Sequence, residues 1–247
     1  MIRRTAFLLY GIVAYAAFLV TILYAIGFVG DLVVPRTIDR GPPAPVAAAI
    51  FIDCLLLALF AVSHSIMARP GFKSWWTKVV PVEIERSTFV LAASLALGLL
   101  FWQWRPLPAP VWHVEHAWGR VILWAIYFTG WALVFASSFV IDHFDLFGLR
   151  QVALFWKGRT YEHPRFKERS LYKLVRHPLM LGFLLAFWAA PTMTQGHLVF
   201  SIMTTAYILI AVQLEERDLL RFLGEDYRKY RQRTPMLIPF GRKNPRE

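Results

Sequence analysis

Long apolar runs separated by short polar segments dominate the chain. Each run approaches the length of about 20 residues with which an α-helix crosses about 30 Å of hydrocarbon. The six candidate spans are Thr5–Gly30, Val46–Ala68, Ser87–Trp104, Trp118–Ile141, Tyr172–Pro191 and His197–Leu214. This pattern predicts an all-α, polytopic membrane protein whose last two segments form a helical hairpin.

The number of full spans is open between five and six. The fifth segment begins with charged residues and ends at Pro191, so little apolar length remains for a crossing. Five spans, or five plus a tight re-entrant hairpin, are the alternatives to six. The Met1–Arg4 start resembles a signal peptide, but the apolar run after it is too long and lacks a small-residue cleavage site before Asp31. We therefore expect an uncleaved first helix.

The charge distribution predicts an orientation. The chain is 57% hydrophobic and carries a net charge of +11. With six spans and the N-terminus inside, 23 of the 27 Lys and Arg residues fall on the inner side. This predicts a multi-pass protein of the cell inner (cytoplasmic) membrane with both termini cytoplasmic. Membrane lipids account for the positive surplus, and since no nucleic-acid recognition motif accompanies it, we expect no nucleic-acid partner.

A group of charged and aromatic residues brackets the predicted hairpin. The fifth segment contains Arg176-His177-Pro178 and Gly182, and the sixth ends at Glu215-Glu216. No Lys, Arg, Asp or Glu lies between His177 and Glu215, and Tyr227 and Tyr230 follow the sixth segment. Because a hairpin returns the chain to the same membrane face, these residues predict a polar pocket there. The two tyrosines could alternatively only anchor the chain at the membrane interface.

The first turn of the fifth segment suits an anionic group. Proline is favoured at the first helical position, so a helix is expected to start near His177, with its free N–H groups and positive dipole end in the pocket. A carboxylate could dock there beside Arg176. Gly182 would allow a ligand or a neighbouring helix to approach closely. Glu215 and Glu216 could accept hydrogen bonds from an ammonium group or from ribose hydroxyls. S-adenosylmethionine carries all of these groups.

A second set of polar residues is predicted at the same membrane face. His64 ends the second span, and Asp142, His143 and Asp145 follow the fourth. His64 could instead cap its helix, and Asp53 lies on the same stripe three turns earlier. Carboxylates and imidazole are common metal ligands, but a hydrated helix end is the preferred interpretation of this run, so no metal is expected. Cys54 is the only cysteine, which excludes an internal disulfide and a thiolate cluster.

The hairpin motifs resemble a known superfamily. Arg176-His177-Pro178-x-x-x-Gly182, Glu215-Glu216-x-x-Leu219 and Phe222-x-Gly224-x-x-Tyr227-x-x-Tyr230 are similar to the C-terminal core of the membrane methyltransferases that include isoprenylcysteine carboxyl methyltransferases and phospholipid N-methyltransferases. The resemblance implies that the His-Pro-x-x-x-Gly and Glu-Glu elements contact S-adenosylmethionine. It also implies one domain over residues 1–247, with four membrane helices in 1–141 and the loop, hairpin and cofactor-binding segment in 142–247.

Four further segments resemble the bacterial methanethiol S-methyltransferases, and that likeness runs nearly end to end. They are Ser63–Lys73, Ile84–Thr88, Phe101–Pro106 and Asp142–Gln151. The resemblance implies that methanethiol is methylated to dimethyl sulfide, with S-adenosylhomocysteine as the by-product. Because the thiolate is the nucleophile, such an enzyme needs a base or a positive environment. By topology we expect His143 to be that base, Asp142 to orient it, and His64 to be the alternative.

Two other functions stay open. One is methylation of another small thiol, a lipid amine or a prenylcysteine carboxylate. The other is a non-catalytic membrane assembly factor that resembles the nitric-oxide-reductase-associated proteins and would not bind S-adenosylmethionine. The expected partners are a small-molecule thiol and membrane lipids, and no obligate protein partner is evident.

Overall fold

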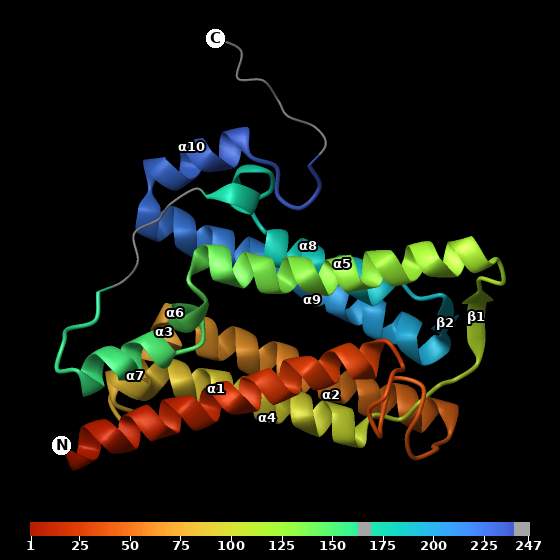
Figure 1. The fold of residues 1–247 in the computed structure, drawn as a ribbon, viewed down its shortest axis with the longest axis horizontal. Helices are drawn as coiled ribbons and strands as arrows, with labels where there is room; N and C mark the ends of the chain where they lie inside the picture. The colour runs from red at the N-terminus through yellow and green to blue at the C-terminus, as the bar shows by residue number, and fades with distance from the viewer. Residues whose placement is uncertain (163–168, 240–247) are drawn as a thin grey trace, which may run out of the picture. The chain divides into compact units, whose positions relative to one another are not determined.

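The computed structural model describes residues 1–162 and 169–239, and most of these are helical (Figure 1). The helices are α1 Ile2–Val29, α2 Val46–Ala68, α3 Pro70–Trp76, α4 Val82–Gln103, α5 Ala117–Ile141, α6 His143–Leu146, α7 Leu149–Trp156, α8 Pro178–Trp188, α9 Gln195–Leu223 and α10 Glu225–Arg233. A 3₁₀ turn covers Ser170–Lys173, and the strands β1 (Pro110–His113) and β2 (Thr192–Thr194) pair in a two-stranded sheet. The all-α prediction is confirmed for the described residues.

Five of these helices are long and apolar enough to cross a membrane: α1, α2, α4, α5 and α9. The predicted fifth span is wrong as a continuous helix, because Tyr172–Pro191 contains only the 11-residue helix α8. At about 1.5 Å per residue, α8 is about 16 Å long and cannot cross alone. Proline sets both limits. Pro178 occupies the first helical turn, and Pro191 disfavours helical geometry at the residue before it.

The chain divides into two compact units that alternate along the sequence. The first consists of Met1–Pro110, Asp142–Arg165 and Thr194–Val199. The second consists of Val111–Ile141, Phe166–Met193 and Phe200–Glu247.

In the first unit, α4 packs against both α1 and α2, and the short helix α7 packs along α1. Gly11 of α1 permits this approach, since a Cβ atom there would lie 2.5 Å from a methyl carbon of Val152. The turn before α7 contains Gly148 at φ +87°, where a side chain would be strained and would meet the backbone of Ser87. The amphipathic helix α7 is thereby held against a membrane-length helix.

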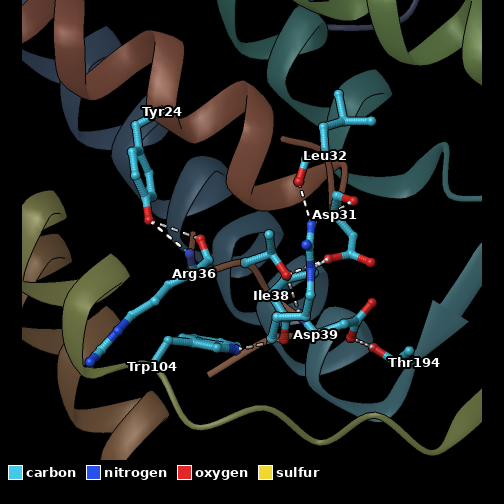
Figure 2. A network of polar contacts seen from close by, with 10 residues as sticks. Tyr24, Asp31, Leu32, Arg36, Ile38, Asp39, Trp104 and Thr194 are labelled. Atoms are coloured by element: carbon cyan, nitrogen blue, oxygen red, sulfur yellow. Dashed lines mark hydrogen bonds and ion pairs between the residues drawn. The ribbon is translucent and has the colours of Figure 1, made fainter. Parts of the chain in front are cut away.

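Side-chain hydrogen bonds hold the connection between α1 and α2 in this unit (Figure 2). The bonded pairs are Arg40 with Asp31, Tyr24 with the Arg36 carbonyl, Trp104 with the Ile38 carbonyl, and Thr194 with Asp39. Thr194 Oγ1 donates to Asp39 Oδ1 at 2.5 Å, and burial nevertheless raises the pKa of Asp39 to about 6. The loop therefore has a defined conformation without regular secondary structure.

In the second unit, α5 and α8 pack closely and run antiparallel. A Cβ atom on Gly130 would lie 2.6 Å from the Gly182 carbonyl oxygen, and one on Gly182 would lie 2.9 Å from the Val134 nitrogen. Higher residue numbers on α5 therefore lie beside lower residue numbers on α8, as in an antiparallel pair. Small residues at such a crossing allow helix backbones to approach closely within a membrane.

Side chains and backbone groups of the second unit satisfy the carbonyl oxygens where α8 ends. Ser201 Oγ donates to the Phe187 carbonyl at 2.7 Å, and the Trp112 indole donates to the Ala190 carbonyl at 3.2 Å. The backbone N–H of Val114 donates to the Pro191 carbonyl at 2.9 Å. Backbone polar groups in hydrocarbon must be paired. Because these carbonyls are paired, the segment formed by α8 and the residues after it can run along α5 to the N-terminal end of α5 although it is only partly helical. Among the predicted alternatives, five long helices with a short hairpin limb match the described residues.

Candidate functional site

A buried ion-pair cluster joins α8 and α9 in the second unit. Glu216 Oε1 accepts hydrogen bonds from Arg176 Nε at 2.7 Å and pairs with His177 Nε2 at 3.1 Å. The three side chains are only 9%, 7% and 8% exposed for Arg176, His177 and Glu216. The hairpin predicted from the sequence therefore brings these three residues together.

Backbone hydrogen bonds attach the segment after α10 to the same cluster. The N–H groups of Arg176 and His177 donate to the carbonyls of Pro235 and Met236 at 2.9 and 3.1 Å. The Arg176 guanidinium also donates to the Thr234 carbonyl at 2.5 Å. Arg176 thus connects the start of α8, the end of α9 and the C-terminal segment. Much of the hydrogen-bonding capacity of Arg176 is already committed within the protein.

The two adjacent glutamates have different environments. Glu215 is 49% exposed on its side chain, and its Oε2 lies 3.8 Å from His177 Nδ1. Glu216 is buried, and its second oxygen lies 3.4 Å from Arg231 Nε. Glu215 is therefore the glutamate that an added ligand can reach, whereas Glu216 organises the cluster.

Pro178 and Gly182 both lie on α8. Pro178 occupies the first turn, as expected from its missing N–H. Gly182 packs against Gly130 and Val134 of α5. The sequence predicted that this glycine would allow either a ligand or a neighbouring helix to approach closely, and the structure shows a neighbouring helix there. This packing alone explains why a side chain is excluded at position 182.

Tyr227 and Tyr230 form part of the protein interior. They are 1% and 2% exposed, and their rings contact edge to face at 5.7 Å. The Tyr230 hydroxyl donates to the Tyr172 carbonyl at 2.6 Å, and burial raises the pKa of Tyr227. The tyrosines thus hold α10 against the segment that precedes α8, and neither ring presents an open face.

Sequence reasoning missed Ser137 on α5. Most serine and threonine hydroxyls in the long helices donate to a carbonyl of the preceding turn, as do those of Thr21, Ser63, Thr88, Ser94, Ser138, Thr204 and Thr205. Ser137 is fully buried, and its Oγ has no partner within the described part of the chain. It lies one turn beyond Val134, which by the antiparallel register places it beside the first turn of α8. Only the tertiary register reveals this position.

The candidate base and its companions lie in the first unit. His143 is 3% exposed, and its Nε2 is 2.8 Å from the hydroxyl of Tyr15, a residue of α1 that sequence reasoning also missed. Burial lowers the pKa of His143. Asp142 forms an ion pair with Arg150 at 2.8 Å and accepts the N–H of Asp145. The Asp142 carboxylate is therefore held by Arg150 and by the first turn of α6.

His64 lies between aromatic rings of the first unit. Its imidazole contacts the rings of Phe60 and Phe89 at centroid distances of 5.2 and 4.8 Å. Its Nδ1 is buried and has no partner among the described residues. Across residues 1–162 and 169–239, no group of three or more His, Cys, Asp or Glu side chains is placed to hold a metal ion.

Comparison with known proteins finds relatives that are similar to this chain over nearly its whole length. The methanethiol S-methyltransferase of Mycobacterium tuberculosis is 56% identical over 238 residues, 96% of this chain and 98% of that protein. Methanethiol S-methyltransferases 1 and 2 of Bradyrhizobium diazoefficiens are 58% and 55% identical, over 95% and 97% of this chain and 82% and 92% of their own lengths. No protein-family model and no solved structure matches the chain.

Membrane-length helices and a buried Arg–His–Glu cluster on the last hairpin define a multi-pass membrane protein with a polar site. This architecture is the one expected of the integral membrane methyltransferases. With its full-length relatives, the chain belongs to the methanethiol S-methyltransferase family.

Proposed function

We propose that the protein transfers the methyl group of S-adenosylmethionine to methanethiol, giving dimethyl sulfide and S-adenosylhomocysteine. The observation that carries this proposal is the 56% identity over 96% of the chain to a protein named methanethiol S-methyltransferase. The enzymatic class, a methyltransferase acting on a thiol, follows from the family. The donor and the particular thiol are the finer parts of the proposal.

The second unit has groups that fit the donor. The half-exposed Glu215 can pair with its ammonium group. The first turn of α8, which begins with Pro178, can accept its carboxylate. The buried hydroxyl of Ser137 beside that turn has no partner among residues 1–162 and 169–239, which supports the presence of a further polar group at this position. When bound, the donor would supply an electrophilic sulfonium methyl group.

Within this proposal, the cluster positions the groups that bind the donor. Arg176, His177 and Glu216 would fix the start of α8 against the end of α9, so that Glu215 keeps its place beside His177. Gly182 would permit the close α5–α8 contact, and Tyr227 and Tyr230 would hold α10 in place. These roles refine the expectation from the sequence, which is that cofactor binding depends on Arg176, His177, Pro178, Gly182, Glu215, Glu216, Tyr227 and Tyr230.

Thiol activation is assigned to the first unit. Near neutrality a simple alkyl thiol is mostly protonated, since even the cysteine thiol has a pKa of about 8.5. Burial lowers the pKa of His143, which favours the neutral imidazole that can receive a proton. Asp142, held by Arg150, would position α6, and His64 is the alternative base.

We further propose that the protein lies in the cytoplasmic membrane with both termini in the cytoplasm. With six crossings, counting the segment that contains α8 as one, 23 of the 27 basic residues fall on one side, which supports this orientation. The hairpin geometry of the second unit supports an even number of crossings, since it brings Arg176 and Glu216 to the same end.

Purified protein in detergent should bind S-adenosylmethionine in a calorimetric titration and should then methylate methanethiol. A lipid amine and a prenylcysteine carboxylate, offered in parallel, test the alternative acceptors. Donor binding with methylation of only these larger substrates would change the acceptor. Absence of donor binding would favour the non-catalytic assembly factor.

A further inference from the structure

Tyr15 and His143 form a contact pair in the first unit, and Tyr15 is the more exposed residue of the two. Tyr15 Oη lies 2.8 Å from His143 Nε2, and the two rings meet edge to face at a centroid distance of 5.7 Å. His143 is 3% exposed, whereas Tyr15 is partly exposed. Tyr15 is therefore the residue of the pair that is more accessible to a small substrate.

Aromatic side chains enclose this pair. The Tyr15 ring lies 6.0, 6.2 and 6.4 Å from the rings of Phe18, Phe144 and Phe147. Phe18 and Phe147 stack on each other at 3.7 Å, and Phe144 is 51% exposed. Sulfur makes favourable contacts with aromatic rings, so this surrounding suits a small thiol that has partitioned into the bilayer.

Charged groups near the pair are engaged with one another. On α6 and α7, Asp142 and Asp145 face Arg150, at 2.8 and 3.9 Å. From α4, the Arg86 guanidinium donates to the Leu146 carbonyl at 2.8 Å, and Tyr161 donates to Asp145 at 3.2 Å. The charged groups described beside the Tyr15–His143 hydrogen bond therefore interact with one another or with a backbone carbonyl.

We propose that Tyr15 is the catalytic residue that receives the proton of the thiol and passes its own proton to His143. The thiol S–H bond breaks, and its proton goes to Tyr15 Oη. The phenolic O–H bond breaks in concert, and its proton goes to His143 Nε2, whose neutral tautomer carries hydrogen on Nδ1. The products are a thiolate, a neutral tyrosine and an imidazolium. The thiolate then takes the methyl group of S-adenosylmethionine, and the imidazolium releases its proton to solvent.

This relay rests on the proposed function, and it names the group of the protein that touches the substrate. It explains why a base with so little exposure can act on an external thiol. It also places thiol recognition on Tyr15 and the three surrounding phenylalanines, a site separate in composition from the Arg176–Glu216 cluster.

The test compares Tyr15→Phe with Tyr10→Phe. Tyr10 is a matched control, because it lies on the same helix and its hydroxyl donates to Thr88 Oγ1 at 3.1 Å. With methanethiol at pH 7, we expect Tyr15→Phe to lower kcat by about 100-fold or more, the size of a lost acid–base contribution. Tyr10→Phe should behave like the parent. Calorimetric affinity for S-adenosylmethionine should be unchanged in both variants.

A more acidic thiol separates proton relay from structure. With 2,2,2-trifluoroethanethiol, which ionises more readily than methanethiol, Tyr15→Phe should approach the parental kcat. His143→Ala should show the same pattern, and the double variant should be no slower than either single one, because residues that act as a unit are not additive. Should Tyr15→Phe fold poorly, 3,5-difluorotyrosine at position 15 keeps the ring and hydroxyl, and its greater acidity should shift the pH profile of kcat to lower pH.

Four results would overturn the relay. Parental turnover of methanethiol by Tyr15→Phe would show that His143 or another base acts alone. An equal loss with both thiols would mean that Tyr15 only supports the structure, as would an unshifted pH profile with difluorotyrosine. If the parent protein binds the donor but methylates neither thiol, the proposed function fails and the relay fails with it. If the parent is active and only the relay result is negative, the proposed function stands.

Discussion

Replacing Glu216 with glutamine tests whether the buried cluster holds the end of the hairpin together. Glu216→Gln keeps the size of the side chain but removes the charge that faces Arg176 at 2.7 Å. Both side chains are less than one-tenth exposed, so water cannot replace the lost interaction. Removing one partner of a buried pair costs about 3–5 kcal/mol of folding free energy, because the other charge stays buried.

Remaining contacts of Arg176 set the expected value near the lower limit. Its guanidinium keeps hydrogen bonds to the carbonyls of Thr234 and Arg231 at 2.5 and 3.1 Å. We therefore expect a loss of about 3 kcal/mol. For a chain of this size, each kcal/mol corresponds to about 2–4 °C, so the midpoint of thermal unfolding should fall by about 6–12 °C.

Two control variants make the result specific. Glu225→Gln breaks a pair with Arg228 at the same 2.7 Å, but both side chains are 63% exposed. Because a surface pair contributes less than about 1 kcal/mol, the unfolding midpoint of this variant should change little. Glu215→Gln should also leave the midpoint nearly unchanged, yet weaken S-adenosylmethionine binding by about 1.5–3 kcal/mol, as expected for a hydrogen bond to a charged group.

Thermal unfolding followed by circular dichroism in one detergent, with and without 0.5 M salt, is the assay. Because the pair is buried, the effect of Glu216→Gln should persist at high salt. A midpoint within about 2 °C of the parent, the smallest shift expected for one kcal/mol, would refute the structural role of Glu216. If Glu215→Gln and Glu216→Gln lose donor affinity equally and neither loses stability, Glu216 would instead be assigned a direct contact with the cofactor.

Three further outcomes are expected. Gly182→Ala places a Cβ atom 2.7 Å from the Gly130 carbonyl oxygen and should lower the midpoint by the equivalent of about 1–3 kcal/mol, whereas Gly98→Ala meets nothing within 4 Å and should not. Asp39→Asn should stabilise the protein above pH 6 and not near pH 4. The reason is that the pKa of Asp39 is raised from 3.8 to about 6 in the folded state, so the stability of the parent falls as pH rises through this interval. An equal effect of the substitution at both pH values would exclude this cause. On a Cys54-free background, an impermeant thiol reagent added outside should label a cysteine at position 113 and spare positions 160 and 229, and the reverse pattern would overturn the orientation.

Much of the fold could be predicted from the sequence, because hydrocarbon imposes length and polarity on each span. The long apolar helices α1, α2, α4, α5 and α9 all correspond to predicted segments. The fifth segment could not be assigned correctly from hydropathy alone. Its residues are apolar enough, but the helix begins only at Pro178 and ends at Trp188, and the hydrogen bonds to the carbonyls of Phe187 and Ala190 stabilise the non-helical backbone that follows.

The candidate site was predictable where one hairpin brings its residues together. Arg176, His177, Glu215 and Glu216 flank a single apolar stretch, so a return of the chain suffices to join them. The division of labour between Glu215 and Glu216 was not predictable, since neighbouring helical residues point in different directions and burial decides their roles. The contact of Tyr15 with His143 joins residues 128 positions apart, and a tyrosine inside an apolar helix gives no local sign of its partner.

Methyl transfer from S-adenosylmethionine to methanethiol is tested most directly by isotopic labelling. Purified protein is supplied with donor carrying a trideuterated sulfonium methyl group and with unlabelled methanethiol, and the headspace gas is analysed by mass spectrometry. We expect dimethyl sulfide with one trideuterated methyl group, formed in equal amount with S-adenosylhomocysteine. Unlabelled dimethyl sulfide, or S-adenosylhomocysteine formed without it, would contradict the proposed reaction.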